Sequence, residues 1–334
     1  MELKRPYLLF LGDVADQLAA KTAQGIKDWR PDWCLGQLRL PGCKADLGLA
    51  DMSLEEGAEA GARTLVIGVA NRGGVFSKQW IGIIEQALAL GMDVASGLHT
   101  RLRAVPEIAE AAARHGRELF DLRHPPQEFD VANGAKRPGK RMLAVGTDCS
   151  IGKMYTALAC EKEMLARGMN ATFRATGQTG IFIAGTGVSV DAVVADFISG
   201  SVEWLAPANS PDHWDLVEGQ GSLFHPSFAG VTLGLIHGAQ PDALVLCHEP
   251  TRTHMRGLPH YKLPGIQETI DACLAHARLV NPEVVCVGLA INTKALGAEE
   301  AASYLAELED RFGLPAVDPV RNGVGRLVDA LERI

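Results

Sequence analysis

The chain has 334 residues, of which 47% are apolar and 22% charged, and its formal net charge is −8. This length is typical of two domains, and the composition is typical of a globular protein with a full core. The negative charge argues against a nucleic-acid partner, and we expect neither a signal peptide nor a transmembrane helix.

Seven cysteines without a C-x-x-C pair indicate reduced thiols in the cytosol. We therefore expect a cytoplasmic protein. We also expect a small-molecule substrate and a homo-oligomer, with neither nucleic acid nor membrane as a partner.

The first half of the chain alternates predicted strands and helices. We expect strands at residues 7–11, 64–70, 93–96 and 118–122, and helices at 14–29, 77–90 and 106–114. Apolar runs bounded by glycine, with helices between them, predict a parallel sheet covered on both faces. This half resembles a Rossmann-like unit, although no G-x-G-x-x-G follows its first strand to indicate a dinucleotide.

A segment rich in proline, glycine and charge, residues 124–140, predicts a linker, and we place the domains at 1–135 and 136–334. In the second domain we expect strands at 142–145, 171–174, 215–218, 243–247 and 284–291, and helices at 155–165, 190–200, 266–278, 298–312 and 323–333. Both domains are therefore expected to be α/β.

The strand 142–145 leads through a glycine-containing loop into the helix that follows. Such a strand–loop–helix unit predicts a P-loop, in which backbone N–H groups and the helix N-terminus hold phosphates. Lys153 would place a positive charge on the outer phosphate oxygens. The expected cofactor-binding residues here are Gly146, Thr147, Asp148, Cys149, Ser150, Ile151, Gly152, Lys153 and Met154.

Two departures from the usual P-loop pattern restrict its chemistry. Thr147 stands where a glycine is usual, and Met154 stands where a nucleotide hydrolase has a hydroxyl ligand for magnesium. Thr156 follows two residues later, on another part of the helix. We therefore expect phosphates to be held but not cleaved, and no metal. A glycine-rich turn that only caps a helix is the simpler alternative.

Other polar residues follow the predicted strands, at the edge where open parallel sheets bind ligands. Glu218 ends a strand before a glycine, which suits a carboxylate that holds a cation or accepts a proton, although structural ion pairs also occur there. His248 follows another strand and is either a substrate contact or a solvated histidine. Further candidates are Gln178 and Asn292 for the cofactor, Gln220 for the substrate, and Arg252, Arg174 and Arg72 for a substrate carboxylate.

Cys149 has two opposed interpretations. Its place at a helix N-terminus near Lys153 predicts a lowered thiol pKa and allows an acyl-cysteine intermediate. Its size also suits a tight loop that needs a small residue, with no chemical role.

The P-loop motif, together with Val217-Glu218-Gly219, resembles that of dethiobiotin synthetase. The whole chain is more similar to a bacterial family of D-glutamate N-acetyltransferases, formerly of unknown function and sometimes labelled NAD-dependent epimerase/dehydratase. The motifs that carry this similarity are 146–154, 178–180, 217–223 and 247–252. The resemblance implies a Rossmann-like domain followed by a P-loop NTPase-like domain. It also implies transfer of acetyl from acetyl-CoA to the amino group of D-glutamate, in D-amino-acid catabolism.

Acetyl transfer needs a group that takes a proton from the substrate amine. We expect Glu218 in this role, with Lys153 and His248 as further catalytic candidates. One alternative is an ATP-dependent ligase or carboxylase like dethiobiotin synthetase, which Met154 disfavours. The other is a non-enzymatic nucleotide- or CoA-binding regulator, which the acid- and histidine-rich loops disfavour.

Overall fold

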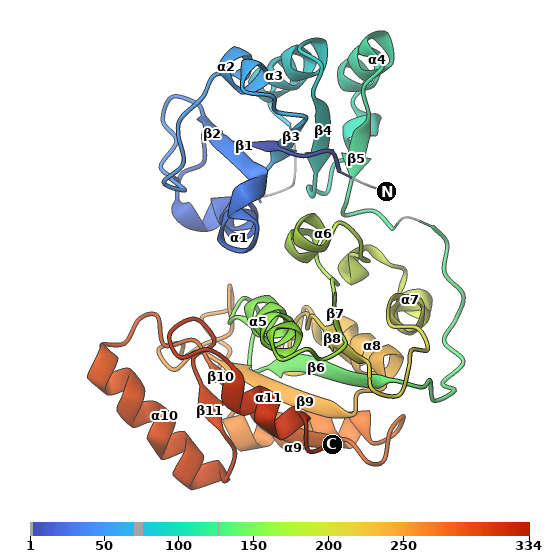
Figure 1. The fold of residues 1–334 in the computed structure, drawn as a ribbon, viewed down its shortest axis with the longest axis vertical. Helices are drawn as coiled ribbons and strands as arrows, with labels where there is room; N and C mark the ends of the chain where they lie inside the picture. Colours follow the sequence, from blue (N-terminus) through green and yellow to red (C-terminus); the bar gives the residue numbers. More distant parts are fainter. Residues whose placement is uncertain (1–2, 70–75, 126) are drawn as a thin grey trace. The chain divides into compact units, whose positions relative to one another are not determined.

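The computed structural model describes residues 3–69, 76–125 and 127–334. The chain forms two compact units, residues 1–126 with 177–192, and residues 127–176 with 193–334. Each unit contains one parallel sheet with helices (Figure 1), which confirms the predicted fold class. The expected boundary at residue 135 lies nine residues after this division, and no sequence pattern indicated that residues 177–192 join the first unit.

The first unit contains a five-stranded sheet in the order β2-β1-β3-β4-β5, with every pair parallel. Three strands, β1, β3 and β4, are wholly buried because helices cover both faces. β1 and β3 are mostly apolar, whereas β4 has the polar residues Asp93 and Ser96 at its ends. The edge strand β2 mixes polar and apolar residues, so the sequence did not predict it. The strands are β1 (Tyr7–Gly12), β2 (Cys34–Arg39), β3 (Thr64–Ile67), β4 (Asp93–Ser96) and β5 (Leu119–Asp121).

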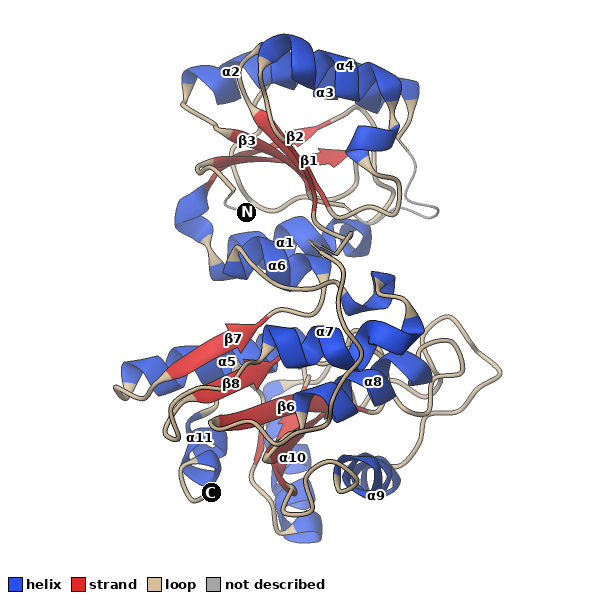
Figure 2. Cartoon of the chain, turned by 90° about the vertical axis from the view of Figure 1, so that its right-hand side faces the viewer, coloured by secondary structure: helices blue, strands red, loops and turns tan. Residues whose placement is uncertain are grey.

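Figure 2 shows α2, α3 and α4 on one face of this sheet and α1 with α6 on the other. The helices are α1 (Lys21–Trp29), α2 (Leu54–Glu59), α3 (Lys78–Ala89), α4 (Pro106–His115) and α6 (Gln178–Ala184). α6 packs against α1, and the Thr179 hydroxyl donates to Thr22 Oγ1 over 3.2 Å. An ion pair between Arg123 and Asp191 also ties this segment to the first unit. Gln178, which was expected at the ligand edge of the second domain, therefore begins a helix of the first unit.

The second unit has a six-stranded parallel sheet in the order β11-β10-β9-β6-β8-β7. Helices α5 and α11 pack together on one face, and α8 packs against α7 and α9 on the other. The strands are β6 (Lys140–Gly146), β7 (Ala171–Arg174), β8 (Trp214–Val217), β9 (Ala243–His248), β10 (Val285–Ile291) and β11 (Ala316–Val317). The helices are α5 (Lys153–Ala166), α7 (Ile198–Leu205), α8 (Ala229–Ala239), α9 (Ile266–Ala277), α10 (Ala298–Phe312) and α11 (Gly325–Leu331).

The second unit also contains elements that the sequence did not predict. The helix expected at 190–200 is replaced by a 3₁₀ turn that still belongs to the first unit, followed in the second unit by another 3₁₀ turn and α7. α8 was missed because its apolar residues are spread around the helix and interrupted by glycines. With 15 residues, α10 is the longest helix in the described chain, and none of the described helices is long and apolar enough to cross a bilayer.

The segment expected to be a linker, residues 124–140, forms hydrogen bonds with residues of the second unit. The backbone N–H groups of Asn133 and Gly134 each donate to the Glu203 carboxylate over 3.0 Å. Arg141, which is fully buried at the start of β6, donates through Nη2 to the carbonyls of Arg137 and Pro138. The linker therefore anchors the strand that leads into the P-loop.

Candidate active site

The predicted P-loop joins β6 to α5. It runs from Gly146 to Gly152, and α5 begins at Lys153. Gly152 has φ = 111°, a conformation that an L side chain rarely adopts, so glycine is required at the start of the helix. A Cβ at Gly146 would lie 2.9 Å from the Cys247 carbonyl on β9, so this glycine lets the two chain segments pack closely.

Lys153 is buried within this loop and is 6% exposed. Its Nζ donates to the carbonyl of Asp148 over 2.6 Å. Burial lowers the pKa of the Lys153 ammonium, and nearby groups including Asp148 and Glu218 act in the opposite direction. A Cβ at Gly219 would lie 2.8 Å from Lys153 Cδ, so glycine there leaves room for the lysine stem. A bound anion would compensate a cation held in this way.

Glu218 follows β8 and is 5% exposed. Its Oε2 accepts from the Thr176 N–H over 2.9 Å, and its Oε1 accepts from Gln220 Nε2 over 3.2 Å. The Thr176 hydroxyl donates to the Glu218 carbonyl over 2.6 Å. The expected base is therefore a fixed, desolvated carboxylate, and Gln220 contacts it directly.

His248 ends β9 beside the P-loop. Its Nδ1 lies 3.0 Å from Thr147 Oγ1, and its carbonyl accepts from the Asn292 N–H over 2.8 Å. Burial, with a smaller contribution from Arg252, lowers the pKa of His248 to about 4. Its imidazole is therefore neutral near pH 7 and can accept a proton or a hydrogen bond. We call the loop 146–152, Glu218 and His248 together the P-loop edge.

Arg252 is bound to the P-loop itself. Its Nη1 donates to Asp148 Oδ2 over 2.8 Å and to the Cys149 carbonyl over 2.6 Å, while Nη2 donates to Glu249 over 2.6 Å. These bonds leave little of its guanidinium for a substrate carboxylate. In this structure Arg252 holds the outer side of the loop in place.

Three further candidates are not shown to contribute a side chain to this edge. Arg174 Nε donates over 2.7 Å to Asp215, which is 1% exposed, so its guanidinium is engaged in a buried ion pair. Gln178 starts α6 in the first unit, whereas the P-loop belongs to the second. Arg72 lies outside the described residues.

The predicted lowering of the Cys149 pKa is wrong. Burial raises the pKa of this thiol, and the lowering effect of Lys153 is smaller. The Thr156 hydroxyl, two residues after Met154, donates to the Gly152 carbonyl over 3.0 Å and lies 3.4 Å from Cys247 Sγ. It is therefore engaged inside the fold, as its position on the helix predicted.

Sequence reasoning assigned no role to two residues of this site. The Arg256 N–H donates to Asp148 Oδ2 over 2.8 Å, and the charge of Arg256 acts on the Cys149 thiol. His225 lies beside Asp148 and Cys149. The available signals were a second arginine four residues after Arg252 and a histidine that ends the glycine-rich loop after β8.

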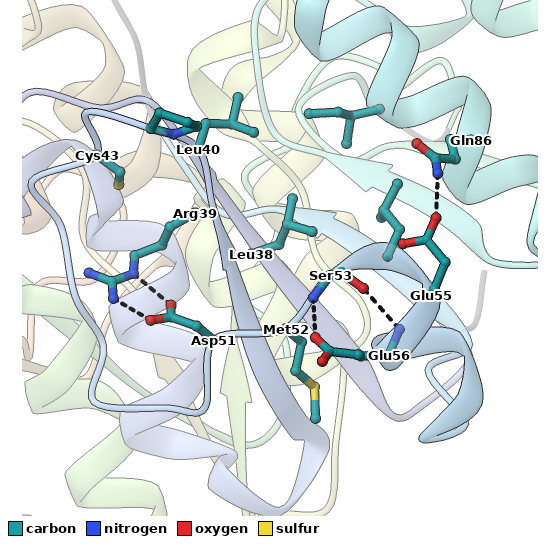
Figure 3. Close-up of a pocket in the computed structure, with 13 residues that line it drawn as sticks. Leu38, Arg39, Leu40, Cys43, Asp51, Met52, Ser53, Glu55, Glu56 and Gln86 are labelled. Atoms are coloured by element: carbon teal, nitrogen blue, oxygen red, sulfur yellow. Dashed lines mark hydrogen bonds and ion pairs between the residues drawn. The ribbon is translucent and has the colours of Figure 1, made fainter.

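The first unit contains a cleft of about 650 Å³ beside β2 and α2 (Figure 3), which we call the first-unit cleft. Its polar side chains pair with one another or with nearby residues. Arg39 pairs with Asp51, the Ser53 hydroxyl accepts from the Glu56 N–H, and Glu55 accepts from Gln86. No cofactor was predicted in this cleft, and its paired groups give no sign of one.

Family models match both units. The model described as a Rossmann-like domain of unknown function, DUF1611_N, matches residues 38–125, and the P-loop domain DUF1611_C matches residues 130–328. A crystal structure of a DUF1611 family protein from Anabaena variabilis is 33% identical, covers 99% of this chain and all of its own, and has a TM-score of 0.90.

Two curated relatives match almost the full length. A protein of Tritonibacter scottomollicae named D-glutamate N-acetyltransferase is 61% identical over 99% of this chain and 100% of its own. A protein of Pseudoalteromonas sp. with the same name is 50% identical over 98% of this chain and 99% of its own. The chain therefore belongs to the DUF1611 family.

Proposed function

We propose that this protein is a D-glutamate N-acetyltransferase that takes the acetyl group from acetyl-CoA. The observation that carries the activity is the 61% identity, over 99% of this chain, to a protein of that name. The second relative, at 50% identity, has the same name. We further propose that the reaction takes place in the cytoplasm, in D-amino-acid catabolism, and that the enzyme is a homo-oligomer.

We assign the phosphates of acetyl-CoA to the P-loop. Coenzyme A carries a diphosphate and a 3′-phosphate, and the loop offers backbone N–H groups, a helix N-terminus and Lys153. Met154 replaces the hydroxyl that would hold magnesium, and the Thr156 hydroxyl is engaged elsewhere. These features suit a ligand whose phosphates are bound but not transferred.

In the transfer step, the amine of D-glutamate attacks the thioester carbonyl carbon. The new N–C bond forms, the C–S bond breaks, the nitrogen gives up a proton to a base, and CoA leaves as a thiol after accepting a proton. We propose Glu218 as the base because it is desolvated and fixed at the strand end. His248 is the second candidate, and its lowered pKa of about 4 makes it a weaker base than an ordinary imidazole.

We propose direct transfer rather than an acetyl-Cys149 intermediate. Cys149 lies in the phosphate-binding loop itself, where its carbonyl accepts from Arg252 Nη1 over 2.6 Å. The raised pKa of the Cys149 thiol also makes it a poor nucleophile.

The test is a turnover assay with acetyl-CoA and either D- or L-glutamate, following free thiol and the mass of the product. We expect N-acetyl-D-glutamate in the absence of ATP, at a rate that added magnesium does not change. Mass spectrometry after mixing with acetyl-CoA alone should find Cys149 unmodified. ADP formation that requires ATP and magnesium would instead identify a ligase, and binding without turnover would identify a regulator.

A further inference from the structure

The P-loop and the loop after β8 bring together three side chains of types that bind transition metals. A carboxylate oxygen of Asp148, Sγ of Cys149 and an imidazole nitrogen of His225 all lie within 4.8 Å of one another. Asp148 is fully buried, and His225 is 2% exposed. Neighbouring chain positions supply Asp148 and Cys149, while the loop after β8 supplies His225, so the fold rather than local sequence assembles the group.

The Asp148 carboxylate has one satisfied and one unsatisfied oxygen. Oδ2 accepts from Arg252 Nη1 and from the Arg256 N–H, each over 2.8 Å. Oδ1 is buried and has no hydrogen-bond partner among the described residues. Such an oxygen is costly inside a protein, and a bound ion is one of the few groups that account for it. Oδ1 is therefore the oxygen that can ligate a cation.

The imidazole of His225 is already oriented. Its Nε2 lies 3.3 Å from the Arg256 carbonyl, and its Nδ1 accepts from the Ser227 N–H over 3.2 Å. A backbone carbonyl on one ring nitrogen is the usual outer partner of a metal-binding histidine. With Nε2 facing the carbonyl, Nδ1 is the nitrogen that can bind a metal. Its contact with the Ser227 N–H is at the long end for a hydrogen bond, so little is lost when a metal replaces it.

We propose that Asp148, Cys149 and His225 form a binding site for Zn²⁺. A thiolate, an imidazole and a carboxylate are the ligands that zinc prefers, whereas magnesium prefers oxygen ligands alone. On binding, the Cys149 thiol loses its proton to solvent and a Zn–S bond forms, with no change in oxidation state. Three protein ligands leave a fourth position open for an oxygen of water or of a bound anion.

The proposed zinc site differs from the usual magnesium site of a P-loop, which this chain lacks a hydroxyl ligand for because Met154 follows Lys153. The sequence argues against magnesium because the residue after Lys153 lacks a hydroxyl. The zinc ligands Asp148 and Cys149 precede Lys153 in the loop, and the third ligand, His225, comes from a different element. Zinc binding does not depend on the proposed use of acetyl-CoA. If the protein binds both zinc and acetyl-CoA, the cation would neutralise the Asp148 carboxylate beside the bound phosphates.

The experiment measures metal binding by the full chain without substrate. Metal is removed with a strong chelator, and the protein is titrated with Zn²⁺ in competition with a chromophoric chelator. Co²⁺ is then used as a spectroscopic probe, because a Co–thiolate bond gives a charge-transfer band in the near ultraviolet. The variants are Cys149→Ser and His225→Gln. The matched controls are Cys43→Ser and His237→Gln, which alter a half-buried cysteine and a half-buried histidine outside the group.

We expect one Zn²⁺ per chain and a thiolate band with Co²⁺. Cys149→Ser should abolish the band, and both variants should weaken Zn²⁺ binding by more than about 100-fold, beyond the usual loss for an outer partner. The controls should bind as the parent chain does. Zinc affinity unchanged in Cys149→Ser and His225→Gln would overturn the site. If a variant unfolds, the parent chain still decides, since a Co²⁺ complex without the thiolate band overturns the site equally.

Discussion

The first-unit cleft and the P-loop edge differ in how their polar groups are satisfied. In the cleft, Arg39 pairs with Asp51, and Glu55 with Gln86. At the P-loop, Asp148 Oδ1 has no partner among the described residues, and burial lowers the pKa of Lys153. A concave surface with satisfied side chains gains little from a ligand, whereas a buried polar atom without a partner and a buried cation gain more. Cleft volume alone would favour the first unit, whereas the proposed site lies in the second.

The strongest test of this comparison is Glu218→Gln. We expect turnover to fall by about 10²–10⁴-fold, the usual contribution of a positioned general base. The matched control is Glu55→Gln in the first-unit cleft, which should leave turnover unchanged. Steady-state kinetics with acetyl-CoA and D-glutamate measures both. Equal losses in the two variants would remove the distinction between the regions.

Lys153→Ala tests the phosphate-binding role of the loop. The substitution should weaken acetyl-CoA binding by about 1.5–3 kcal/mol, the range for a hydrogen bond to a charged group. Calorimetry measures the affinity, and Lys162→Ala, an exposed lysine on the same helix, is the control. Affinity that is the same in both variants would mean that the loop does not hold the phosphates.

His248 predicts a pH dependence of stability. Because burial lowers its pKa from 6.5 to about 4, the unfolded chain binds more protons than the folded chain between these values. Stability is therefore full above pH 7 and falls as the pH drops through 6.5 towards 4, by about 2 kcal/mol at pH 5 from this residue. Denaturant titrations at several pH values measure the loss.

His248→Gln should flatten this part of the pH profile, whereas substitution of the exposed His115 by Gln should not. A profile that is unchanged by His248→Gln would show that the histidine does not titrate as its burial implies.

The smallest effect is expected in the first-unit cleft. Arg39→Ala breaks an ion pair at the surface, where solvent screens the charges. Turnover and acetyl-CoA affinity should stay at the parent values, and the melting temperature should change little. A clear loss of acetyl-CoA affinity would show that the cleft takes part in binding.

Local sequence predicted the bounds of elements whose ends are marked by particular residues, such as glycine. The helix 298–312 matches α10, which lies between Gly297 and Gly313, and Gly313 has a left-handed φ of 64°. The strands 93–96 and 171–174 match β4 and β7. The P-loop was found because a strand, a glycine pattern and a helix occur in one short stretch.

The partners of charged side chains could not be predicted in this way. Whether Arg174 faces the ligand edge or Asp215 depends on its pairing with β8, which is set by the fold. Arg252 binds Asp148 across more than 100 positions of sequence, and no local pattern indicates this contact. The Cys149 pKa was predicted in the wrong direction because burial outweighs the nearby positive charge.

The place of α6 has a consequence for biosynthesis. The first unit needs residues 177–192, which the ribosome makes only after β6, α5 and β7 of the second unit. Its five-stranded sheet is therefore synthesised well before the helix that covers α1. If folding starts from the N-terminus during synthesis, the first unit stays incomplete while part of the second unit leaves the ribosome. A fragment ending near residue 126 would lack α6, so cutting the chain at its apparent boundary would not release a finished domain.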